Sequence, residues 1–82
     1  MSQRARLIAK IRNNPKAVRF DDACKVAIWL GFTGEGGSGS HRTFARPGEM
    51  TQLNFQKQPG GFVKPYHARQ LIAMIDKYES EI

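Results

Sequence analysis

The segment from Gly36 to Phe44 carries the residue types with the clearest chemical potential in this sequence. A stretch of glycine and serine leads directly into His41, which opens a short run of alternating polarity. Imidazole has an unperturbed pKa of ~6.5, the side-chain value closest to neutrality, so it can take up and release protons near pH 7. A histidine at the mouth of a flexible loop is therefore a candidate general acid or base.

Further polar groups could bind an anionic ligand beside His41. They are Gly39, Ser40, Arg42, Lys64 and His67. The loop glycines allow backbone N–H groups to approach a phosphate, although a mobile hairpin loop without a ligand is the alternative. Lys64 and His67 fall at the start of an expected helix, whose N-terminus favours anions, although His67 could equally be a solvent-facing helix residue.

Other chemical motifs are excluded by their context. Residues 34–39 match G-x-G-x-x-G, but a dinucleotide fingerprint requires a helix after the loop, and here a strand is expected. No Gly-Lys-Ser/Thr follows, which excludes a P-loop, and nothing constrains Ser38 or Ser40 to form a serine triad with His41. Two histidines and one cysteine fit no zinc spacing, and the carboxylates are scattered. We therefore expect any catalysis to need no metal and no small-molecule cofactor.

Positive charge is concentrated at the N-terminus. The net charge is +6, and residues 1–19 hold six basic side chains and no acidic one, whereas residues 20–82 hold seven of each. Basic charge attracts nucleic acid without reading its sequence, which favours a polyanionic ligand. The alternative is a solvated helix face that keeps a small protein soluble.

Three helices are expected from the spacing of apolar residues. The first spans 2–13 with a thin apolar stripe, the second spans 20–30, and the third starts at Lys64-Pro65, with proline at its first position. The second helix should bury Phe20, Ala23, Cys24, Ala27 and Ile28. The third should bury Ala68, Leu71, Ile72, Ile75 and Tyr78.

Three short strands should position His41. They are expected from Phe32 to about Glu35, from His41 to Arg46, and from Met50 to Gln56, with Pro47-Gly48 as a turn. If Phe44 faces the core, alternation along the strand places His41 on the opposite, open face, where a substrate can reach it.

The length of 82 residues fits one domain, with residues 1–19 as a basic helical extension and 20–80 as the core. The fold class is therefore α+β in the order α-α-β-β-β-α. The single cysteine, Cys24, cannot form an internal disulfide, which indicates a reducing compartment. No apolar stretch is long enough for a membrane span or a signal core, so we expect a cytoplasmic protein without a membrane partner.

The order of these motifs resembles the HicA toxin family of bacterial type II toxin–antitoxin systems. The matching residues are Leu30-Gly31-Phe32, Gly39-Ser40-His41, Phe44, the strand around Leu53 and Lys64-Pro65. The resemblance covers roughly residues 20–78. Gly-Ser-His alone is a weak motif, but its place between Leu-Gly-Phe and a Lys-Pro helix start makes the combination fairly specific.

The resemblance implies a fold like the double-stranded RNA-binding domain (dsRBD), a three-stranded antiparallel sheet with helices on one face. It also implies an mRNA interferase, a toxin that cleaves messenger RNA, whose invariant histidine corresponds to His41, and a HicB-type antitoxin that covers the active site. Many members have a second histidine directly after the first, and here that position is Arg42. Arginine could still contact phosphate.

Three functions remain open from the residues. The first is a metal-independent ribonuclease that uses His41 as acid or base and binds RNA through Gly39, Ser40, Arg42, Lys64 and His67. The second is a non-catalytic RNA-binding module, which would read duplex RNA by its shape and would not need His41. In the third, the conspicuous surfaces, including the acidic tail and Trp29, serve only a protein partner.

Overall fold

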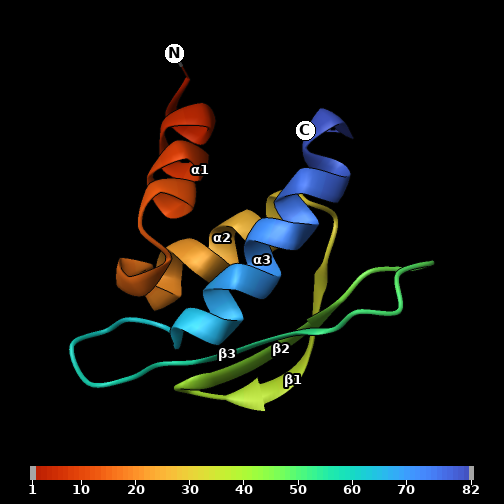
Figure 1. The fold of residues 1–82 in the computed structure, drawn as a ribbon. Coiled ribbons are helices and arrows are strands. Elements are labelled where there is room, and N and C mark those ends of the chain that lie inside the picture. The colour runs from red at the N-terminus through yellow and green to blue at the C-terminus, as the bar shows by residue number, and fades with distance from the viewer. Residues whose placement is uncertain (1, 82) are drawn as a thin grey trace.

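The chain forms its elements in the predicted order of two helices, three strands and a helix (Figure 1). The computed structural model describes residues 2–81, apart from the side chains of Glu35 and Ser38. The helices are α1 (Gln3–Asn13), α2 (Phe20–Trp29) and α3 (Pro65–Tyr78), and the strands are β1 (Thr33–Ser38), β2 (His41–Ala45) and β3 (Leu53–Gln56). Short 3₁₀ turns occupy Pro15–Ala17 and Glu79–Glu81. The predicted α+β class is confirmed.

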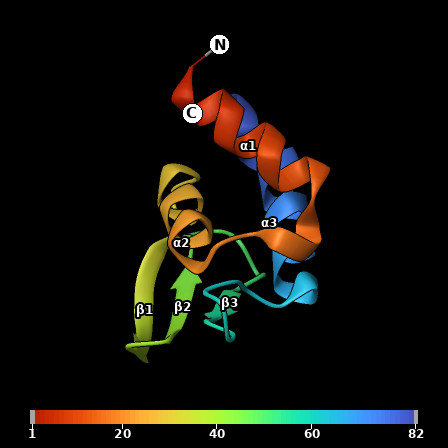
Figure 2. The same ribbon diagram turned by 90° about the vertical axis from the view of Figure 1, so that its left-hand side faces the viewer.

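The strands form one antiparallel sheet in the order β1-β2-β3. Helices α2 and α3 contact β3, and α1 packs on α3 rather than on the sheet (Figure 2). The other face of the sheet carries no helix in either ribbon view (Figures 1 and 2). This arrangement leaves one sheet face open, as the alternation of polarity along β2 predicts.

One apolar core joins the helices to the sheet. Its largest fully buried side chains are Phe32, Phe44, Phe55, Leu30, Leu53, Leu71, Ile75, Val26 and Val63. The rings of Phe44 and Phe55 pack at 5.8 Å between centroids from neighbouring strands. Ile8 and Ile11 of α1 belong to the same core, so the basic N-terminal helix is packed against the domain.

The buried face of α2 differs from the predicted one. Ile28 is 58% exposed and Cys24 only half-buried, whereas Val26 and Leu30 are buried. The packed stripe runs through Ala23, Val26, Ala27 and Leu30, the same i, i+3, i+4, i+7 spacing turned around the helix. Helix α2 packs against β3 and α3, and this packing determines which of its faces is buried.

Helix α2 ends within one residue of the predicted end at position 30, and Gly31 follows as the left-handed residue. Gly31 has φ +88°, its N–H donates to the Ile28 carbonyl (3.0 Å), and the Phe32 N–H donates to the Ala27 carbonyl (3.1 Å). These two bonds form the Schellman pattern, which turns the chain back toward the helix. Phe32 thereby enters the core, and its ring meets Tyr78 of α3 edge-on at 6.2 Å between centroids.

Helix α3 and the strands β1 and β3 also differ in detail from the predictions. On α3, Met74 is buried while Ile72 is half-buried. Strand β1 continues to Ser38 beyond a bulge between Gly34 and Gly36, which lets the glycine stretch pair with β2. Strand β3 begins only at Leu53, and Met50 is 98% exposed. In residues 2–81 no helix is both long and apolar enough to cross a membrane.

Candidate functional site

His41 is the first residue of β2 and follows a two-residue turn. Gly39 has φ +52°, and a glycine at the first position of such a turn matches the twist of the two strands. The backbone carbonyl of Ser40 accepts a hydrogen bond from the Lys57 N–H (2.7 Å), which ties the turn to the end of β3. The His41 side chain is exposed, on the face opposite to Phe44.

Gly37 has a structural reason to be glycine. Its φ is +97°, and a Cβ there would lie 2.0 Å from the carbonyl oxygen of His41. The glycine therefore allows β1 to approach the backbone of β2 at the residue that carries the imidazole. Part of the glycine-rich stretch serves the hairpin, rather than a phosphate.

The open face beside His41 is polar. Gln56 is the cross-strand neighbour of His41, and Thr43 pairs with Asn54 in the same register. Thr43 Oγ1 donates to Asn54 Oδ1 at 2.8 Å. Neither Asn54 nor Gln56 was singled out from the sequence, although the alternation of buried and exposed residues in β3 could have shown them.

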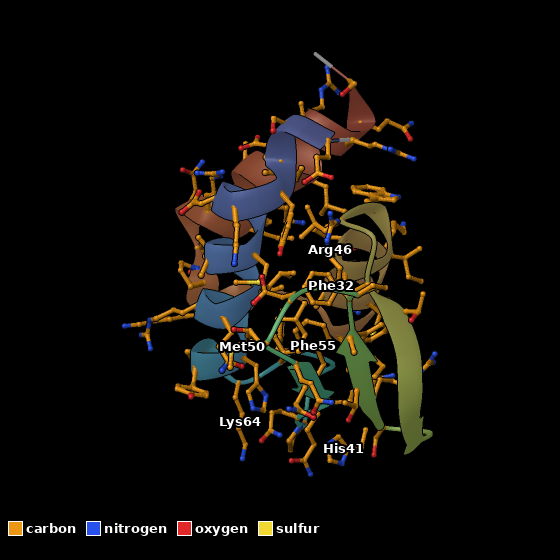
Figure 3. All side chains as sticks on the ribbon, turned by 90° about the vertical axis from the view of Figure 1, so that its right-hand side faces the viewer. Phe32, His41, Arg46, Met50, Phe55 and Lys64 are labelled. Carbon is orange, nitrogen blue, oxygen red and sulfur yellow. The ribbon has the colours of Figure 1, made fainter. Side chains whose placement is uncertain are left out.

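Lys64 and His67 lie at the same end of the molecule as His41. Lys64 is the N-cap residue of α3, makes no side-chain capping bond, and is followed by Pro65 at the first helical position. Figure 3 shows the Lys64 and His41 side chains at the edge of the fold opposite to the chain termini. The N-terminus of α3 therefore adds partial positive charge to this end.

The surroundings of His67 disfavour the charged form of its imidazole and lower its pKa. Burial lowers its pKa, and the positive charges of Lys64 and His41 lower it further. Its Nδ1 is enclosed and, within the described residues, has no hydrogen-bond partner. A buried N–H without an acceptor is costly, so the proton belongs on Nε2. In this tautomer Nε2 can donate a hydrogen bond to a ligand.

Arg42 lies on the other face of the sheet from His41. Its register partner in β3 is Phe55, and its guanidinium carbon lies 5.7 Å from the centre of the Phe44 ring. Burial raises the pKa of the Cys24 thiol, and the charge of Arg42 partly opposes that shift. The structure thus places Arg42 near α2, apart from the other predicted anion-binding groups.

The acidic tail pairs with arginines at the far end of the molecule. Arg12 of α1 contacts both Asp76 and Glu79 at 2.7 Å, and Arg46 contacts Glu81 at 2.9 Å. Trp29 is half-buried, with the Arg4 guanidinium carbon 4.9 Å above its ring. Both features proposed for a protein partner therefore have partners inside the fold.

The candidate site lies on an exposed part of the surface, since the side chains of His41 and Lys64 are both exposed. A cavity of about 330 Å³ lies between α1 and the C-terminal turn, lined by Ser2, Arg4, Ala5, Ile8 and Glu79, well away from His41. Among the described residues, no group of three or more histidine, cysteine or acidic side chains could hold a metal ion. The groups at hand are two imidazoles, an ammonium and a helix N-terminus, which suit a phosphate.

Tyr66 was missed by the sequence interpretation. It is 63% exposed in the first turn of α3, and its ring lies 5.7 Å from that of His67 between centroids. A tyrosine beside a candidate phosphate-binding histidine was visible in the printed order Lys-Pro-Tyr-His.

Comparisons of the chain with protein-family models, with curated proteins and with solved structures find no match. The resemblance to the HicA family therefore rests on the motifs in the sequence.

Proposed function

We propose that this chain is a metal-independent endoribonuclease that cleaves messenger RNA, the toxin of a bacterial toxin–antitoxin pair acting in the cytoplasm. One observation carries the proposal: the exposed imidazole of His41 lies at the same end of the fold as Lys64 and His67. The HicA-like motifs support it, and they suggest a dsRBD-like domain that a HicB-type antitoxin neutralises.

The chemistry requires few protein groups because RNA carries its own nucleophile. The 2′-hydroxyl attacks the adjacent phosphorus, its proton must be removed, and the leaving 5′-oxygen must gain one. His41 is exposed and can serve as the base or the acid. Lys64 supplies positive charge for the pentavalent phosphate, and His67, neutral with its proton on Nε2, donates to a phosphate oxygen.

One imidazole cannot supply the whole rate enhancement. A positioned general acid or base typically contributes ~10²–10⁴-fold. Charge stabilisation by Lys64 and the first turn of α3, together with orientation of the RNA on the polar sheet face, must account for the rest.

The test is incubation of purified wild-type protein and His41→Ala with an RNA transcript in the presence of EDTA. We expect discrete cleavage by the wild type and none by His41→Ala, with unchanged circular dichroism because the side chain is exposed. Lys64→Ala should slow cleavage, whereas Lys25→Ala, which removes an exposed charge from α2, should not. A folded His41→Ala protein that still cuts the transcript would refute the proposal.

The same experiment separates the second function. An RNA that stays intact with the wild type but migrates as a shifted band identifies a non-catalytic RNA-binding module. Co-purification with the protein encoded by the adjacent reading frame tests the antitoxin, and protection of the RNA by that protein tests whether it covers His41.

A further inference from the structure

Tyr66 presents an aromatic ring to solvent next to the candidate phosphate-binding groups. Three large apolar side chains among the described residues are well exposed: Ile28, Met50 and Tyr66. Single exposed apolar residues are common and need no explanation by themselves. Tyr66 differs from the other two by its position, because it stands between Lys64 and His67 in the chain and its ring contacts the His67 ring.

The Tyr66 ring makes contacts within the fold that favour one orientation. Pro65 fixes the backbone at the start of α3, His67 contacts the ring at an interplanar angle of 62°, and Gln70 Nε2 donates to the tyrosine hydroxyl at 3.4 Å. A ring that is already held in place loses little conformational entropy when a flat partner stacks on it. With 63% of the residue exposed, such a partner has access.

We infer that Tyr66 is a stacking platform for an unpaired base next to the phosphate that Lys64 and His67 bind. This inference rests on the proposed function and names its substrate class as single-stranded RNA. Bases in a duplex have both faces covered by their neighbours, whereas an unpaired base can splay out and stack on an aromatic side chain. Phosphate contacts alone would accept either form, so the ring decides between them.

The location of the ring relative to His41 fits this role. The charge of His41 acts on His67, and His67 contacts Tyr66, so the three residues follow one another across this end of the fold. A strand of RNA whose phosphate lies at His67 can therefore place one flanking base on Tyr66 while the 2′-hydroxyl faces His41.

The test measures binding with the cleavage-silent His41→Ala full-length chain. Fluorescence anisotropy follows its affinity for a labelled single-stranded RNA and for a labelled RNA duplex of the same composition. A second variant adds Tyr66→Ala, a third adds Tyr66→Phe, and the matched control adds Ile28→Ala, which removes an equally exposed apolar group from α2.

We expect Tyr66→Ala to weaken single-strand binding by about 5- to 150-fold, the affinity that one stacked base contributes, and to leave duplex binding unchanged. Tyr66→Phe, which keeps the ring, should restore most of the affinity, and Ile28→Ala should behave as the parent. An unchanged single-strand affinity of Tyr66→Ala overturns the inference, as does an equal loss on the duplex or no RNA binding by the parent.

This outcome is separable from that of the proposed function. If wild-type protein leaves RNA intact but Tyr66→Ala weakens single-strand binding, the ribonuclease proposal fails and the stacking platform stands. If wild type cleaves RNA and Tyr66→Ala binds and cleaves equally well, the ribonuclease stands and the platform is wrong. In that case the exposed Tyr66 ring is assigned to a contact with a protein partner instead of RNA.

Discussion

Replacing Gly37 tests whether the glycines before His41 are needed to form the hairpin. Its φ is +97°, and an added Cβ would lie 2.0 Å from the His41 carbonyl oxygen, closer than the 3.0 Å below which something must shift. An L-residue in such a backbone conformation costs ~1–3 kcal/mol. Overpacking against a neighbour that cannot give way, here backbone, typically costs a further ~1–3 kcal/mol.

Gly37→Ala should therefore lower the free energy of unfolding by about 2–6 kcal/mol. A chain of this size has a total stability on the order of 4–12 kcal/mol, so the variant should be marginally folded. It should also cleave RNA poorly, because the same shift moves the backbone that carries the imidazole. Urea unfolding followed by circular dichroism measures the loss.

Gly36 is the matched control within the same strand. It has no positive φ, and a Cβ there meets nothing within 4 Å. Gly36→Ala should leave stability unchanged or raise it by up to ~1 kcal/mol, because alanine restricts the unfolded chain. Equal unfolding midpoints for the two variants would show that the clash does not operate, and the structural role of Gly37 would be refuted.

Three further predictions concern the rest of the fold. Hydrogen bonds from Lys77 and Tyr78 lower the pKa of Glu49 from 4.5 to about 2, so its contribution to stability is complete above pH 4.5 and is lost as pH falls toward 2. The urea midpoint of the wild type should fall over that pH range, and this pH dependence should be weaker in Glu49→Gln. An equally steep pH dependence in the variant would contradict the hydrogen bonds from Lys77 and Tyr78 to Glu49. Burial lowers the pKa of His67 below its ordinary 6.5, so the unfolded chain binds this proton more readily, and stability should decline as pH falls from 6.5 through the folded pKa. An NMR titration of the folded protein should show His67 changing charge at lower pH than a free imidazole, and a titration at or above 6.5 would refute its burial. Ile11→Ala should cost about 2–5 kcal/mol because the side chain is only 2% exposed; a loss below 1 kcal/mol would mean that α1 is not part of the core.

The order of the elements follows from local signals that need no tertiary information. Pro65 starts α3, and Gly31 ends α2, because each residue fits a backbone conformation at a helix end. Alternation along β2 correctly placed His41 on the exposed face and Phe44 in the core, because side chains of a strand alternate between its two faces.

Packing decides what periodicity leaves open. The apolar residues of α2 cover more than half its circumference, so spacing alone led to Ile28 as a core residue, whereas the packing of α2 against β3 and α3 buries Val26 instead. Spacing likewise cannot bring together residues that are distant in sequence. His41 and His67 are 26 positions apart, and only the docking of α3 beside β3 brings them to the same end of the fold.

The ion pairs of the described residues lie at the helical end of the molecule rather than at the hairpin end. Carboxylates of the C-terminal segment and Glu49 bind Arg12, Arg46 and Lys77, so the helical end compensates much of its own charge. At the hairpin end, no described carboxylate pairs with Lys64. Since Lys64 has no ion pair within the described residues and stands at a helix N-terminus, an anion from outside the chain is a suitable partner for it. Arg6 and Lys10 of α1 also lack an ion pair within the described residues, but Lys64 lies at the end where His41 is exposed, which is why the proposed ribonuclease assigns phosphate binding to Lys64.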